Sequence, residues 1–245
     1  MPGGLTMRDS VRVGPALRQA PALAGSLAEQ VYQRIKDELF DFRLLPGDRF
    51  TEAELALRLG VSRTPVRLGL ARLEREGFVL PSPRSGWQVR PFDFERFEAL
   101  YDVRVVLELA AVERLCARER MDDGGMLAAL VDVWLVPPDQ RILDGRMVAQ
   151  LDEAFHCSLV AAAGNAEMAL IHREVTEKIR IVRRLDFTKE FRVDATYEEH
   201  GAILRAVLAR RGEAAGRMLR GHIEMSKAEV RKITLHMLHV AREGS

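Results

Sequence analysis

Hydrophobic residues recur every three or four positions along most of this chain, which is the spacing of amphipathic helices. In the first third of the sequence the pattern has clear start and stop signals, and it predicts helices at 27–40, 52–60 and 62–77. Ser26 and Thr51 each open a capping box, because a Glu follows three residues later. Gly60 and Gly77 suit the left-handed position that commonly ends a helix.

Residues 78–91 break the helical pattern. Two short runs of β-prone residues, 78–80 and 87–90, flank a turn rich in Pro, Ser and Gly. These runs predict a small hairpin. Helix, turn, short helix, tight turn, helix and hairpin together are the layout of a winged helix-turn-helix.

After Pro91 the pattern is helical throughout and predicts an all-helical antiparallel bundle. We expect its helices at 93–119, 123–135, 143–163, 166–186, 194–210 and 213–241. The fold class is therefore mainly α. We divide the chain into a flexible N-terminal arm (1–25), a winged helix-turn-helix domain (26–91) and a helical domain (92–245).

Composition narrows the classes of protein that fit this outline. Lys and Arg number 37 against 36 Asp and Glu, a net charge of +1, so any nucleic-acid surface must be local. The two cysteines, Cys116 and Cys157, form no Cys-x-x-Cys motif, which fits a reducing compartment, and we expect a cytoplasmic protein. The longest apolar run, 126–136, is shorter than the roughly 20 residues of a transmembrane helix, so we expect no membrane partner.

The helix at 62–77 has a face that can read DNA. On a helical projection Val66, Gly69, Leu70 and Leu73 form the inner side. The outer side begins with hydroxyl and guanidinium groups at the N-terminal end, from which recognition helices commonly reach base edges and phosphates. These candidate DNA contacts are Ser62, Arg63, Thr64 and Arg67. A surface helix whose arginines are merely solvated is the alternative.

A longer string of residues carries a family resemblance. The string consists of Pro46-Gly47-Asp48, Leu55-Ala56, the run from Gly60 to Arg67, the run from Leu73 to Gly77, and Gly86 in the wing. It resembles the DNA-binding domain of GntR-family transcriptional regulators. The resemblance implies that Gly86 also lies in the DNA-binding surface. In one departure, Leu68-Gly69-Leu70 stands where the family usually has Glu-Ala-Leu, so Leu68 replaces a carboxylate on the outer face.

Histidines on the predicted helices suggest a second site. Asp152 and His156 are spaced i, i+4 and leave one face of a helix. His200 shares a face with Ile203, Leu204 and Val207, and His222 shares one with Met218, Leu219 and Met225, so both should point inward. Three imidazoles and one carboxylate suit a divalent transition metal. The alternative is that each histidine is an ordinary core residue that donates to a backbone carbonyl oxygen.

The second half resembles the FCD effector domain of the FadR subfamily of GntR regulators. The pattern is Asp152-x-x-x-His156, Ala163-Gly164-Asn165, Glu199-His200 and His222. The resemblance implies that Asp152, His156, His200 and His222 bind the metal, with zinc or nickel as the expected ion. His172, His236 and His239 have no place in the pattern and are expected to be structural or exposed. Cys157 projects about 100° from His156 on a helix and is a poor ligand candidate.

Arg104 also fits the family's first effector helix, where the arginine typically faces the ligand cavity. Facing inward, its fork of donors would bind a small carboxylate beside the metal. The other interpretation is a surface pair between Arg104 and Glu108 at i, i+4 spacing.

These features predict a ligand-responsive transcriptional regulator. We expect a repressor that binds a double-stranded DNA operator as a homodimer and senses a small organic acid through the bound metal. A metal-dependent hydrolase with an accessory winged helix is the rival interpretation. A pure protein-interaction bundle is a third, although it would not need inward histidines.

Overall fold

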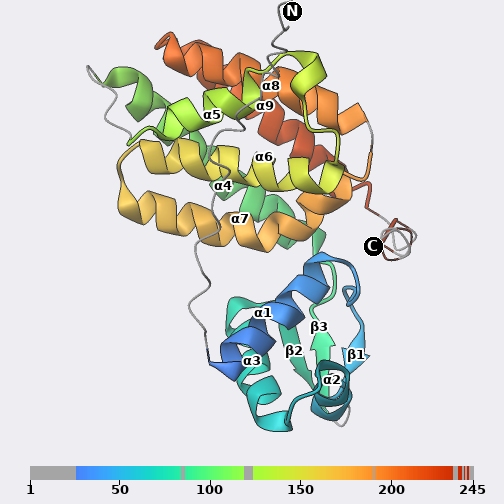
Figure 1. Cartoon of the computed structure of the whole chain (residues 1–245). Coiled ribbons are helices and arrows are strands. Elements are labelled where there is room, and N and C mark those ends of the chain that lie inside the picture. The colour runs from blue at the N-terminus through green and yellow to red at the C-terminus, as the bar shows by residue number, and fades with distance from the viewer. Residues whose placement is uncertain are drawn as a thin grey trace, which may run out of the picture.

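The structure, a computed structural model, describes residues 26–83, 86–118, 124–189, 191–233, 237, 238, 240 and 242. Figure 1 shows two bodies joined end to end, a small one with a sheet and a larger helical one. The small body contains α1 (Leu27–Phe40), β1 (Arg49–Phe50), α2 (Glu52–Leu59), α3 (Arg63–Glu76), β2 (Val79–Ser82) and β3 (Gly86–Val89). This is the expected winged helix-turn-helix.

Local sequence signals set the helix ends of the small body. The Thr51 hydroxyl accepts a hydrogen bond from the Glu54 N–H, and the Glu54 carboxylate accepts one from the Thr51 N–H, which completes the capping box. Ser26 accepts from the Glu29 N–H, whereas the Glu29 carboxylate pairs with Arg72. Gly60 and Gly77 end their helices with φ of 68° and 82°.

The hairpin of β2 and β3 is confirmed, but the sheet has a third strand that the pattern did not indicate. Its order is β1-β3-β2, and β1 pairs with β3 through Phe50 and Trp87. Two residues are too few to show an alternating pattern. Gly86 has a φ of 87°, and a Cβ there would lie 2.7 Å from the Phe50 carbonyl oxygen, so the third strand requires glycine at this position.

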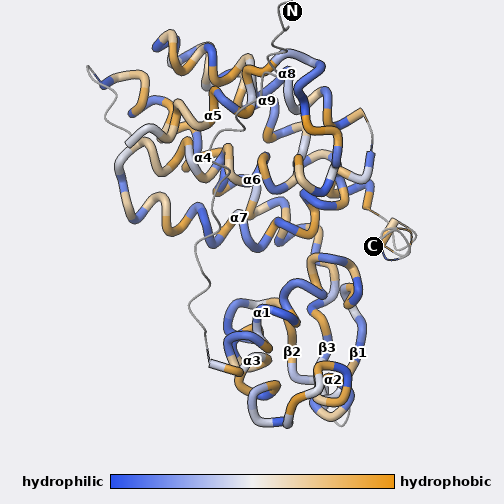
Figure 2. Tube along the Cα trace, in the orientation of Figure 1, coloured by the Kyte–Doolittle hydropathy of each residue, from blue (hydrophilic) through white to orange (hydrophobic). Residues whose placement is uncertain are grey.

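The larger body holds the long helices. They are α4 (Phe94–Ala117), α5 (Met126–Trp134), α6 (Gly145–Ala162), α7 (Ala166–Asp186), α8 (Phe191–Leu208) and α9 (Gly212–Val230), with a 3-10 turn at Pro138–Gln140. Hydrophilic and hydrophobic residues alternate along them (Figure 2), as amphipathic helices require. Among the described residues no helix is long and apolar enough to span a membrane.

Two predicted helix ends in this body were wrong. The helix expected at 194–210 begins at Phe191, and the helix expected to reach residue 241 ends at Val230. Periodic apolar residues continue past that end, at Ile233 and Leu238, and no glycine or proline follows to mark it. Periodicity alone therefore did not reveal the break.

Each body has its own hydrophobic core, and the two are joined by specific contacts. The small core lies between 31 and 89, while the large core extends over the helical body and also takes in Phe42 and Leu45 from the segment after α1. At this junction Arg184 of α7 pairs with Asp41 and donates to the Phe40 carbonyl oxygen. Helix α7 therefore contacts both bodies.

Candidate metal centre and nucleic-acid interface

Four metal-binding candidates from three helices converge inside the helical body. Asp152 and His156 lie on α6, His200 on α8 and His222 on α9, and all four are buried. One potential ligand atom from each lies within 4.8 Å of the others. The expected i, i+4 pair and the two inward histidines are therefore brought together. Met218 and Met225, expected on the inner face with His222, are instead about half exposed.

Three of the separations between these ligand atoms match the spacing around a metal ion, and Asp152 Oδ1 lies farther from the Nε2 atoms of His156 and His222, at 3.7 and 3.9 Å. The Nε2 atoms of His156 and His222 are 3.2 Å apart, and those of His200 and His222 are 3.4 Å apart. Asp152 Oδ1 lies 3.2 Å from His200 Nε2. Tetrahedral ligands at bonds of about 2.0–2.1 Å are separated by roughly 3.3 Å. The donor set thus fits a tetrahedral or slightly larger coordination sphere.

Two carboxylates outside this set orient two of the imidazoles. Glu108 Oε2 lies 2.6 Å from His156 Nδ1, and Glu199 Oε2 lies 2.6 Å from His222 Nδ1. Because an ionised carboxylate only accepts hydrogen bonds, each Nδ1 carries the proton and each Nε2 has a free lone pair. Two lone pairs facing each other repel unless a cation lies between them. Such carboxylate–histidine pairs commonly support metal ligands.

The ionisation of these groups suits metal binding. Burial by itself would raise the pKa of Glu108, but the positive charge of Arg104 and the hydrogen bonds from His156 and His172 hold that pKa well below its usual value. Burial lowers the pKa of His200 well below its usual value, and it lowers the pKa of His222 as well. Both rings are therefore neutral near pH 7, the form that binds a metal.

Asp152 is held by a buried arginine that the sequence did not point to. Arg183 pairs with Asp152 Oδ2, which leaves Oδ1 facing the histidines. Burial would raise the pKa of Asp152, but the positive charge of Arg183 and the hydrogen bond from His200 lower it well below the usual value. The carboxylate is therefore ionised and aimed at the centre of the group.

Arg104 combines parts of its two sequence interpretations. It does pair with Glu108, with Nε and Oε1 2.5 Å apart, but both side chains are buried, so the surface pair was wrong. Arg104 also lines a cavity that contains Asp152 and Arg183. The i, i+4 spacing could not distinguish a buried pair from an exposed one, because α4 is covered on that side by other helices.

The remaining histidines and Cys157 stand apart from the four. His172 is buried, with Nε2 3.0 Å from Glu108 Oε1, and it therefore has a structural role. His236 and His239 lie outside the described residues. Cys157 lines a groove with residues of α6 and α7, such as Leu170 and Arg180.

The sequence did not reveal three residues that hold the candidate metal ligands in place: Glu108, Glu199 and Arg183. Glu199 stands beside His200 in the quoted pattern, yet it contacts His222 on another helix. Glu108 was considered only as a partner of Arg104. Arg183 had no signal, because its contact with Asp152 joins two helices and 31 positions of sequence.

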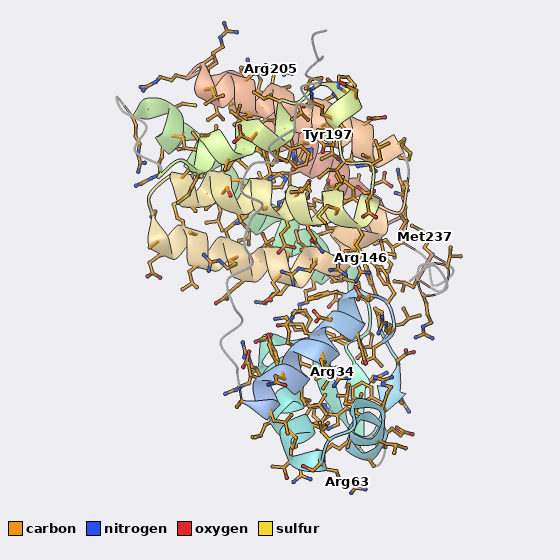
Figure 3. The ribbon with its side chains drawn as sticks, viewed as in Figure 1. Arg34, Arg63, Arg146, Tyr197, Arg205 and Met237 are labelled. Atoms are coloured by element: carbon orange, nitrogen blue, oxygen red, sulfur yellow. The ribbon has the colours of Figure 1, made fainter. Side chains whose placement is uncertain are left out.

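The other candidate surface lies on α3 of the small body. Ser62, Arg63, Thr64 and Arg67 are exposed, whereas Val66, Gly69, Leu70 and Leu73 are buried, which agrees with the projected faces. Arg63 lies at the end of the molecule farthest from the helical body (Figure 3). Arg67 is paired with Glu52 of α2 at 2.9 Å. Leu68 is exposed among these polar groups.

Comparisons with known proteins agree with this arrangement of a winged helix-turn-helix and a helical bundle. Residues 27–89 match the model described as bacterial regulatory proteins, gntR family, and residues 99–225 match the FCD domain. The Nta operon transcriptional regulator of Aminobacter aminovorans is 31% identical over 183 residues, covering 75% of this chain and 84% of that protein.

Two further relatives extend the comparison. The transcriptional repressor RspR of Escherichia coli strain K12 is 22% identical over 206 residues, covering 84% of this chain and 89% of that protein. The crystal structure of a GntR protein from Rhodococcus sp. RHA1 has a TM-score of 0.69 at 24% identity, covering 86% of this chain and 100% of that chain.

The chain belongs to the GntR family of bacterial transcriptional regulators and carries an FCD domain, as in the FadR subfamily. Its relatives are transcriptional regulators and not enzymes. They confirm the expectation of a transcriptional regulator over the rival interpretation of a metal-dependent hydrolase.

Proposed function

We propose that this regulator binds one divalent metal ion through Asp152, His156, His200 and His222, and that a small carboxylate effector completes the coordination and pairs with Arg104. The convergence of the four ligand atoms within 4.8 Å carries the proposal. Neutral imidazoles and an ionised carboxylate are the ligands that zinc and nickel accept, and these are the ions we expect. The metal would supply a positive centre for an anionic effector.

We assign the DNA-binding role to residues 26–91 and the effector-binding role to residues 92–245. In the first unit Ser62, Arg63, Thr64, Arg67 and the wing around Gly86 form the proposed DNA surface. Exposure of the four α3 side chains at a helix N-terminus supports this assignment. A protein that binds operators in a bacterial cell acts in the cytoplasm.

Repression is the regulatory sign we propose, because the related RspR is described as a repressor. In this scheme the effector-free protein occupies a double-stranded operator as a homodimer, and effector binding releases it. Differential affinity of the effector for the two states would supply the coupling free energy.

The experiment that tests the metal site combines metal analysis with thermal stability. Purified protein supplemented with zinc or nickel should retain about one ion per chain, and chelator should lower its melting temperature because a metal that binds only the folded state stabilises it. Replacing His200 by Gln should remove both the ion and the sensitivity to chelator. Protein that retains no ion and has a melting temperature indifferent to chelator would refute the metal site.

A further inference from the structure

Leu68 is an exposed leucine in the middle of the proposed DNA surface. Its exposed fraction is 58%, and it does not belong to the described residues that pack in the core of the small body. A single exposed leucine is ordinary on a protein surface. The place of Leu68 is not ordinary, because it lies on α3 beside Thr64 and Arg67, which we assign to DNA contacts. The first turn of this helix, marked by Arg63 in Figure 3, lies far from the helical body.

The geometry of α3 directs Leu68 away from the core. At 3.6 residues per turn its side chain projects within about 40° of Thr64 and about 140° from the buried Leu73. Thr64, Leu68 and Ala71 follow one another at i, i+4 and i+7, so their side chains share one side of the helix. Apart from the Thr64 hydroxyl group, this side presents an apolar strip in which Leu68 is the largest member.

The charged neighbours on both sides of this strip are held by other helices. Arg67 pairs with Glu52 of α2 at 2.9 Å, and Arg72 pairs with Glu29 of α1 at 2.6 Å. Because the two pairs draw the guanidinium groups toward different helices, more than half of the Leu68 surface stays open.

The major groove of DNA offers one apolar group to such a strip. All four bases present hydrogen-bond donors or acceptors there, but only thymine adds a methyl group, at C5. A leucine that covers this methyl group is favourable, because both groups lose contact with water. Over any other base the leucine would cover polar atoms and offer them no hydrogen bond, which is unfavourable.

We propose that Leu68 reads the C5 methyl group of a thymine and thereby makes the operator require thymine at one position of each half-site. Hydrogen bonds from Arg63 and Arg67 and the apolar contact of Leu68 then select different features of the same half-site. This inference rests on the proposed function, because it requires α3 to enter the major groove.

Replacing thymine by deoxyuridine isolates this contact, because only the methyl group is lost and every hydrogen-bonding atom stays. The full-length protein first selects its half-site from a pool of random duplexes, and each thymine of that half-site is then replaced in turn. Fluorescence anisotropy at fixed salt should show a loss of affinity of about fourfold at one thymine position, the contribution of one buried methyl group.

Two variants assign the effect to Leu68. Leu68→Ala should bind the thymine and deoxyuridine duplexes with affinities within about 1.5-fold of each other, because the contact is already lost in the protein. Leu57→Ala is the matched control, since Leu57 is a leucine of α2 with an exposed fraction of 87%, and it should keep the full deoxyuridine effect.

The outcomes separate this inference from the proposed function. Wild-type protein that selects a half-site but tolerates deoxyuridine at every position would overturn the methyl contact and leave operator binding standing. A Leu68→Ala variant that keeps the full deoxyuridine effect would do the same. Protein that binds all duplexes alike would overturn the proposed operator binding, and this inference with it.

Discussion

Each buried histidine of the metal-binding group is oriented by a different neighbour. Carboxylates hold His156 and His222 through their Nδ1 atoms, whereas His200 stacks on Phe155 with ring centroids 3.8 Å apart and an interplanar angle of 10°. Stacking fixes the plane of a ring but does not select which nitrogen carries the proton. The two carboxylates therefore determine the tautomers that metal binding needs.

Replacing Glu199 by Gln should weaken zinc binding by about 10- to 100-fold, because a neutral amide replaces the charged carboxylate that orients His222. The control is Glu198→Gln, a more exposed neighbour that pairs with Arg141 instead. Competition with a chelator of known affinity measures both variants. Equal zinc affinity in the two would contradict an orienting role for Glu199.

The stability of the chelated protein should fall as pH drops below about 6.5. Burial lowers the pKa of His172, His200 and His222, so below the usual value of 6.5 the unfolded chain binds protons that the folded chain refuses. Each such histidine contributes a slope of about 1.4 kcal/mol per pH unit below that value. Urea denaturation between pH 7.5 and 5.5 measures the slope.

The variant His172→Gln provides the comparison for this pH dependence, because His172 is outside the proposed ligand set. The free energy of unfolding of this variant should fall less steeply with decreasing pH, by the roughly 1.4 kcal/mol per pH unit that one histidine contributes. Stability that rises as the pH falls would show that the buried rings are protonated in the folded protein.

Arg63 and Arg67 should each contribute to operator binding. Replacement by Ala is expected to weaken it by roughly 5- to 150-fold if the guanidinium contacts a base. Arg67 must first leave Glu52, so the loss should be smaller for Arg67 than for Arg63. Arg75→Ala, exposed at the other end of α3, serves as the control. Unchanged affinity of the Arg63/Arg67 double variant at fixed salt would refute these contacts.

At the scale of the element, α7 connects the two sites through adjacent residues. Arg183 faces inward to Asp152, and Arg184 faces the small body, where it contacts Asp41 and the Phe40 carbonyl oxygen at the end of α1. Consecutive residues on a helix point about 100° apart, which lets one helix turn contact both partners. Lys36 of α1 adds a second link, because it pairs with Glu177 at 2.5 Å.

Replacing Arg184 by Ala should therefore uncouple metal binding from DNA binding. In the wild-type protein we expect zinc to change operator affinity by about fivefold or more, and in the variant by less than about twofold. Zinc affinity itself should stay the same in both. Arg173→Ala, exposed on the same helix, is the control. A variant with the full zinc effect on fluorescence anisotropy would exclude this contact as the link.

At the scale of the whole molecule, one chain offers a single recognition helix to DNA. Regulators that read DNA with a winged helix-turn-helix commonly use two copies related by a two-fold axis, one per half-site. The near-neutral net charge of +1 makes a long-range attraction to DNA weak, so a second copy would add affinity that one local surface lacks.

We therefore expect a homodimer on a nearly palindromic operator. Light scattering should give twice the 27.6 kDa mass of the chain, and the protein should bind a duplex with two half-sites at two chains per duplex. A monomeric mass with one chain per duplex would contradict the dimer.

Local signals in the sequence determined most of the helices and which face of each helix points inward. The capping box at Thr51, the glycines at 60 and 77, and the inward positions of His200 and His222 could be predicted, because capping and helical periodicity act over a few residues. The ligand set itself came from a family pattern and not from spacing.

Tertiary structure decided the features that depend on contacts between distant segments. Strand β1 exists because β3 pairs with it, and Arg104 and Glu108 are buried because other helices cover α4. The contact of Arg183 with Asp152 joins two helices. No local pattern encodes such contacts, since each depends on which helix packs against which, and that choice is made by the core as a whole.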